Sequence, residues 1–145
     1  MKITKRPPLI DEVIIKKVQV ISGKIDIEKE GFTLGTVVTT KDGGTTWNIQ
    51  DRPIFTAGVY KEDDEVFHNG SSWISLTNDN QTEPKEDEPN WKELEKFDAN
   101  GILLENITES GNIAVLVTGE VREKHLEHYD SSMKKALFKN KIILK

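Results

Sequence analysis

Histidines and carboxylates are the side chains of this sequence best suited to chemistry. His125 and His128 stand three positions apart in a stretch that predicts a helix, so both imidazoles could face one metal ion. Glu127 or Asp130 would then supply a further ligand. Histidines on a charged helix are more commonly solvated, and a pair alone does not make a metal centre. We therefore predict no metal site.

The carboxylates form runs at 62–65 and 86–88, which the surrounding residues place in turns and loops. A catalytic carboxylate needs burial or a charged partner to shift its pKa, and runs of this kind are solvated. The sequence also lacks a phosphate-cradling glycine loop, a nucleophile elbow and any cysteine. We therefore expect neither enzymatic activity nor a cofactor.

Aromatic residues offer a different chemistry, because six of the ten fall between positions 47 and 91. Protein sites for sugars stack flat exposed rings on the pyranose, with amides or carboxylates nearby. Tyr60, Trp73 and Trp91 could form such a platform, with Asn78 beside them and Asp79 and Gln81 nearby in the sequence. The same rings could instead build the core of a small insert, since a short segment needs aromatic residues to bury enough surface.

The chain has 145 residues with a net charge of −5, distributed unevenly. Residues 25–119 carry a net charge of −12, whereas 1–24 and 120–145 are basic. An acidic middle would repel a nucleic-acid backbone, so we expect no nucleic-acid partner. No apolar run is long enough for a membrane span, and no signal peptide is apparent. The basic ends favour an acidic partner surface or are ordinary solvated lysines.

The hydrophobic pattern predicts a mainly β protein of the α+β type. The expected strands alternate or are rich in β-branched residues, and Asn69-Gly70 is typical of a tight hairpin turn. They lie at 13–21, 24–27, 33–40, 102–107, 113–118 and 142–144. Helical spacing predicts one late helix over 122–139, with Leu126, Tyr129, Met133, Ala136 and Leu137 as its apolar stripe.

These elements predict a small β body with one C-terminal helix, interrupted by a small three-stranded β insert. The polar stretch 77–90, with Pro84 and Pro89, is expected to be a long exposed loop. We predict an N-terminal arm at 1–22, extended over 1–12, a body at 23–51 and 97–145, and an insert at 52–96.

The insert resembles the small chitin- and cellulose-binding modules of chitinases. Residues 55–73 read FTAGVYKEDDEVFHNGSSW, and PNWKEL follows at 89–94 after the polar loop. The modules share this order of aromatic residues, acidic step, glycine turn and closing Pro-x-Trp. In this chain Asp63 replaces the usual glycine, and Phe55 stands for the first tryptophan. The resemblance implies a module that binds surface polysaccharide through Tyr60, Trp73, Trp91 and Asn78; related modules also occur in phage head and tail proteins.

The flanks resemble the lambda-type capsid decoration proteins of tailed phages. The matching segments are GFTLGTVV at 31–38, DANGILLENI at 98–107 and NIAVLVTGEVR at 112–122, before the helix and last strand. The resemblance implies a trimer on the outer surface of a virion, bound to the phage major capsid protein. The family's arm adds a strand to the coat protein. The residues that would do so here are Val13, Ile14, Ile15, Val18 and Val20.

The resemblances imply a structural virion protein that stabilises an expanded shell, made in the host cytoplasm, with a module projecting outward. The alternative is a carbohydrate-binding module or adhesin without a role in the capsid. Both can hold, because weak glycan sites gain avidity on a particle with many copies. An accessory domain of a polysaccharide enzyme is a third class, which would need a tethering linker.

Overall fold

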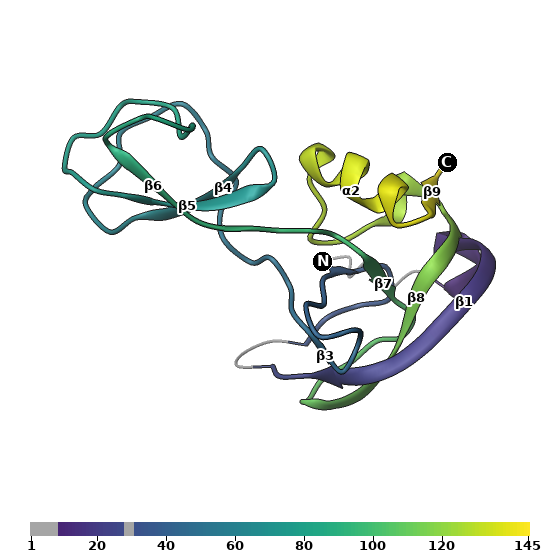
Figure 1. Cartoon of the computed structure of the whole chain (residues 1–145). Helices are drawn as coiled ribbons and strands as arrows, with labels where there is room; N and C mark the ends of the chain where they lie inside the picture. The colour runs from purple at the N-terminus through teal and green to yellow at the C-terminus, as the bar shows by residue number, and fades with distance from the viewer. Residues whose placement is uncertain (1–8, 28–30) are drawn as a thin grey trace, which may run out of the picture. The chain divides into compact units, whose positions relative to one another are not determined.

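The computed structural model describes residues 9–27 and 31–145, which form two compact units (Figure 1). The first unit contains the described residues up to Ile49 together with Ala99–Lys145, and the second is Gln50–Asp98. The insert predicted at 52–96 lies inside the second unit. The chain is mostly β, as predicted, with a short helix near its C-terminus and a separate three-stranded sheet.

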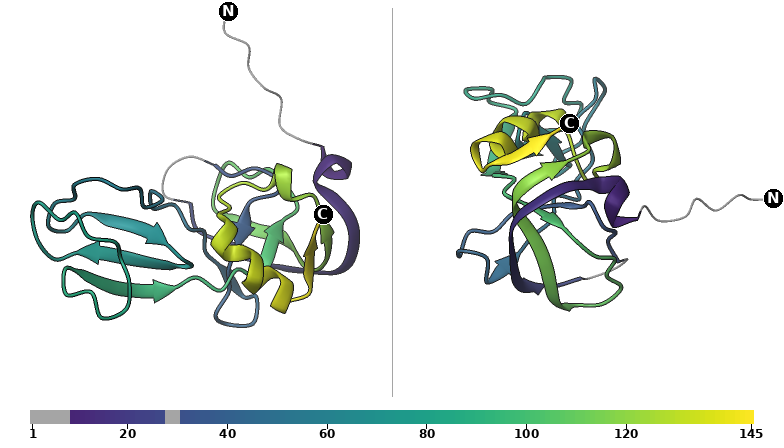
Figure 2. Two further views of the ribbon diagram at one scale, coloured as in Figure 1. Left: turned by 90° about the horizontal axis from the view of Figure 1, so that it is seen from above. Right: turned by 90° about the vertical axis from the view of Figure 1, so that its right-hand side faces the viewer.

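The first unit is built on a sheet of six strands. Its order is β2 (Val37–Val38), β7 (Gly101–Leu103), β8 (Gly111–Val121), β1 (Ile14–Ile25) and β3 (Thr46–Trp47), and β9 (Ile142–Leu144) pairs with β8 in parallel. β1 and β8 are the two long strands and run antiparallel side by side (Figures 1 and 2). They therefore form the frame to which the shorter strands attach.

Residues 14–22 do not form a separate arm, contrary to prediction. They belong to β1, which is paired with β8 from Ile14 opposite Val121 to Ile25 opposite Gly111. The strands predicted at 13–21 and 24–27 are one strand, because Ser22-Gly23 continues the pairing. Ile10–Val13 is a single helical turn, α1, rather than extended chain. The rest of the predicted arm, 1–8, lies outside the described residues.

The long helix predicted over 122–139 is also wrong. The structure has a 3₁₀ turn at Glu123–His125, another at Ser131–Met133, and a six-residue helix α2 at Lys134–Lys139. Between the two turns the backbone is hydrogen-bonded to the segment around β2. The N–H of Glu127 donates to the carbonyl of Gly35, and the carbonyl of Glu127 accepts from the N–H of Val37. The Asp130 side chain then accepts from the N–H of Ser132 and starts a new turn.

Trp47 lies in the main core of the first unit. Its ring is buried among aliphatic side chains of β1, β2, β7 and β8, and the N–H of its indole donates to the carbonyl of Gly44. The buried members of this cluster are Ile25, Val38, Trp47, Leu103, Ile107, Ile113 and Val115. Burial of these side chains pins the short strand β3 to the frame.

The second unit is an antiparallel sheet in the order β4 (Glu65–His68), β5 (Ser71–Ser75) and β6 (Trp91–Lys96). Asn69 and Gly70 connect β4 to β5 with φ of 50° and 82°, as a tight hairpin turn requires. The predicted loop at 77–90 contains no strand. Val66, Trp73 and Trp91 form the core, with Phe55 and Tyr60 packed against it.

Candidate docking site on strand β1

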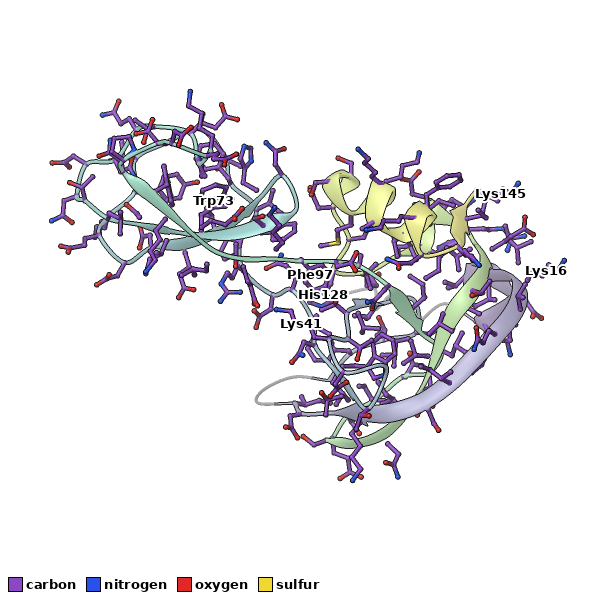
Figure 3. All side chains as sticks on the ribbon, in the orientation of Figure 1. Lys16, Lys41, Trp73, Phe97, His128 and Lys145 are labelled. Atoms are coloured by element: carbon purple, nitrogen blue, oxygen red, sulfur yellow. The ribbon has the colours of Figure 1, made fainter. Side chains whose placement is uncertain are left out.

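The prediction that Trp73 and Trp91 form an exposed platform for a sugar is wrong. Trp73 and Trp91 are only 7% and 4% exposed, because they form the core of the second unit; Trp73 is labelled in Figure 3. Their indole N–H groups donate to the backbone carbonyls of His68 and Thr82 at 3.1 and 2.9 Å. Both rings line a small pocket of about 250 Å³ together with charged side chains such as Lys85 and Glu86. At these exposures neither ring presents the open flat face that stacking on a pyranose needs.

Tyr60 and Asn78 are both engaged in local structure. Tyr60 is half-buried, stacks on Phe55 with ring centres 5.5 Å apart, and exchanges hydrogen bonds with the backbone of Thr56. The amide oxygen of Asn78 accepts from the N–H of Glu62 at 3.1 Å. The structure therefore places the four predicted glycan-binding residues as parts of the framework of this unit.

The histidines do not form a metal centre. His125 and His128 are not on one helical face, since His125 ends a 3₁₀ turn and His128 lies beyond it with a φ of 51°. The His128 ring instead packs edge-on against Phe32 at 5.1 Å. Among residues 9–27 and 31–145, no three metal-ligating side chains gather at one point. Within those same residues, no helix combines the length and apolarity that a membrane crossing requires.

The edge of β1 that faces away from β8 is uncovered over most of its described length. Among residues 9–27 and 31–145, β8 covers one edge along the whole strand, whereas β3 covers the other only at Lys24 and Ile25. Every residue from Ile15 to Val20 is exposed, and Val18 is 60% exposed. Of the five predicted arm residues, Ile15, Val18 and Val20 are therefore available to a partner, while Val13 and Ile14 belong to the core.

The backbone of β1 presents hydrogen-bonding groups along this edge. The N–H of Lys24 donates to the carbonyl of Thr45 at 2.9 Å, so the backbone of Lys24 faces away from β8. Because strand residues alternate between the two edges, the N–H and C=O groups of Ser22 and Val20 face the same way. β3 does not reach these positions. An open edge of this kind is a template for an added strand.

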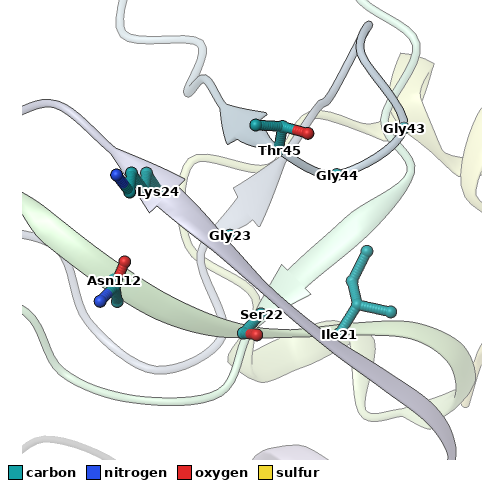
Figure 4. Close-up of a pocket in the computed structure, with 8 residues that line it drawn as sticks. All are labelled: Ile21, Ser22, Gly23, Lys24, Gly43, Gly44, Thr45 and Asn112. Atoms are coloured by element: carbon teal, nitrogen blue, oxygen red, sulfur yellow. The ribbon is translucent and has the colours of Figure 1, made fainter.

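A groove of about 640 Å³ lies where the open edge ends (Figure 4). It is formed by β1, the start of β8 and the turn before β3, and it is lined by Ile21, Ser22, Gly23, Lys24, Gly43, Gly44, Thr45 and Asn112. A Cβ on Gly23 would lie 2.2 Å from the carbonyl oxygen of Gly44. The turn therefore packs directly on the backbone of β1, an approach that only glycine permits.

Asp42 holds the turn that forms one wall of the groove. Its carboxylate accepts from the N–H and hydroxyl of Thr46 at 2.9 and 2.6 Å and from the hydroxyl of Thr40 at 2.8 Å. These hydrogen bonds, the Thr46 hydroxyl first, lower the pKa of Asp42 to about 2. The charged carboxylate thus fixes the Lys41–Thr46 segment from within.

We expect the turn to become less stable in acid. Because the folded-state pKa of Asp42 lies below its unfolded value of about 4, the stabilisation is complete above pH 4 and is lost as the pH falls through 2. Asp42→Asn should remove this pH-dependent part, which we would measure by thermal unfolding between pH 2 and 6. Asp79→Asn, an exposed acid of the other unit, is the control. Identical pH profiles for wild type and Asp42→Asn would contradict the role of Asp42.

No family model, curated protein or solved structure matches this chain. The sequence identified the β-branched residues of β1, but it did not reveal that Lys24 and Asn112 are paired across β1 and β8. A β-branched run mixed with lysines and without acids was the available signal, since edge strands carry such residues.

Proposed function

We propose that this protein is a structural virion protein that binds the outside of a phage capsid and stabilises the expanded shell. The observation that carries the proposal is the open edge of β1, with Ile15, Val18 and Val20 exposed along it. An extended segment of the coat protein would add a strand there and cover the apolar side chains. Binding only to the expanded shell would stabilise it by mass action.

The sequence resemblance supports the same proposal and adds a trimer on the capsid as the bound form. Three lysines, Lys16, Lys17 and Lys24, stand among the apolar residues of β1, which gives the edge a positive charge suited to an acidic coat-protein surface. Because Trp73 and Trp91 are buried, we do not extend the proposal to glycan binding by the second unit.

The test is co-sedimentation with expanded capsids of the phage that encodes this chain, prepared without it. We expect saturable binding at a fixed ratio to coat protein. Val18→Glu should weaken binding about tenfold, because it removes a buried valine from the interface and places a charge there. Val59→Glu is the matched control, since Val59 lies in the other unit and is 61% exposed against 60% for Val18.

Two outcomes would count against this function. Absence of saturable binding by the wild-type protein at every salt concentration would remove the capsid as partner. Equal weakening by Val18→Glu and Val59→Glu would leave a capsid-binding protein but would show that β1 is not its docking edge.

A further inference from the structure

We propose that the groove at the end of the β1 edge binds a carboxylate side chain, and that the segment docking on β1 is an extended acidic one. The inference rests on the proposed function in taking the β1 edge as the docking surface. It goes further in assigning the chemistry of the partner and the place where that chemistry is recognised.

The first support is a set of donors gathered on one face of the sheet. Ser22 and Lys24 are two residues apart on β1 and so share a face, and Lys24 is paired with Asn112 of β8. Figure 4 draws all three among the residues that line the groove, with Ser22 and Asn112 on the opposite side of β1 from the glycine turn. A hydroxyl, an ammonium and an amide together can donate several hydrogen bonds to one carboxylate.

These donors are unoccupied within the part of the chain that the structure describes. No hydrogen bond or ion pair joins the side chains of Ser22, Lys24 or Asn112 to another described residue. The described residues that line the groove include no acid. Asp42, in the adjoining turn, already accepts hydrogen bonds from Thr40 and Thr46. A carboxylate entering the groove would therefore meet a positive charge with no acidic competitor among the lining residues.

The charge of β1 also decides between possible occupants. The strand carries Lys16, Lys17 and Lys24 and no acidic residue. Pairing the same edges of two copies would bring these lysines together, and like charges on paired strands destabilise the pair. An acidic segment of another protein would instead be attracted by these lysines. The edge thus fits an acidic strand better than a second copy of β1.

The turn before β3 limits where the added strand can lie. The hydrogen bond from Lys24 to Thr45 occupies the edge at that position, and the carbonyl of Gly44 covers Gly23. An incoming strand can therefore pair regularly with Val20 and Ser22 and must end at the groove. Nearer the start of β1, register shifts between Ile14 and Val20 interrupt the alternation of the edge groups. The terminal residue of its paired stretch is the one whose side chain would reach Lys24 and Asn112.

The test uses labelled eight-residue peptides of alternating threonine and valine that carry glutamate at both ends, so that either strand direction places an acid at the groove. Matched peptides carry glutamine or lysine at the ends. Fluorescence anisotropy should show the glutamate peptide binding about fivefold more tightly than the glutamine peptide, the size of one exposed ion pair of about 1 kcal/mol. The lysine peptide should bind most weakly.

Variants then locate the preference. Lys24→Gln should bind the glutamate and glutamine peptides equally, whereas Lys92→Gln, an exposed lysine on β6, should keep the wild-type ratio. Thermal unfolding would confirm that both variants are folded. Equal binding of the glutamate and glutamine peptides by the wild-type protein, no binding of any peptide, or an unchanged preference in Lys24→Gln would each overturn the assignment.

The peptide and capsid assays separate the two proposals. Capsid binding without a peptide preference would remove the carboxylate groove and keep the capsid as partner. A glutamate preference without capsid binding would keep the groove chemistry and assign the edge to a different acidic partner.

Discussion

Trp91→Ala is expected to unfold the second unit rather than to abolish a binding site on an intact one. The Trp91 ring is buried against Tyr60 at 5.3 Å and Phe55 at 6.2 Å, and its N–H donates to the carbonyl of Thr82. Removing a buried tryptophan costs about 3–5 kcal/mol. A unit as small as Gln50–Asp98 has little stability to spare, so this loss should exceed it.

Urea denaturation followed by near-ultraviolet circular dichroism would measure this effect. We expect the transition of the second unit to disappear while that of the first remains, since each unit has its own core. Trp91→Phe is the control, because it retains a ring and should lose less stability. A folded Trp91→Ala protein that no longer binds a polysaccharide column would contradict the structural role and restore the sugar-binding interpretation.

The elements that could be predicted from the sequence are those set by local chemistry. Asn69-Gly70 identifies the β4–β5 hairpin because those residues tolerate positive φ. Pro84 and Pro89 mark the strand-free stretch before β6 because proline cannot donate to a ladder. The last strand, β9, and the end of α2 at Asn140 follow from a short apolar run and a helix-stopping residue.

The helix predicted over 122–139 does not form as one helix, because part of its backbone is hydrogen-bonded to a segment far away in the sequence. Leu126 to Met133 have helical spacing, but the backbone of Glu127 bonds to Gly35 and Val37, about ninety positions earlier. Periodicity reports which side chains would share a helical face and carries no information about such pairing. The strand predicted at 33–40 is reduced to Val37–Val38, which pair with β7 as a ladder, while Gly35 and Thr36 contact β7 through separate backbone hydrogen bonds to Leu103.

The sequence predicts the strand that carries the candidate site but not which of its edges is open. The β-branched run at 13–21 predicts a strand, but which of its edges is covered depends on β8 and β3, which lie far away in the chain. The burial of Trp73 could not be predicted either, because a tryptophan in a core and a tryptophan on a stacking platform look the same in a sequence. What decides is the hydrogen bond from its indole to His68, a contact within the folded hairpin.

Trp47→Ala should have the largest effect on the first unit and should also damage the groove. Trp47 is 2% exposed, fills the space beneath Gly23 and Gly101, and holds Gly44 through a hydrogen bond of 3.1 Å. Its removal is expected to cost about 3–5 kcal/mol through lost packing and the cavity left behind. The turn at 43–45 would also lose the bond that fixes it over β1, so the β3 end of the edge would open.

Two measurements test both parts of this prediction. Urea denaturation would give the loss of free energy of unfolding, and amide hydrogen exchange would report the Lys24 N–H, whose bond to Thr45 should break more often in the variant. Trp47→Phe keeps most of the ring but cannot donate to Gly44, so it should lose less stability and still speed exchange at Lys24. Unchanged exchange at Lys24 in Trp47→Phe would show that packing alone, and not the indole hydrogen bond, holds the turn in place.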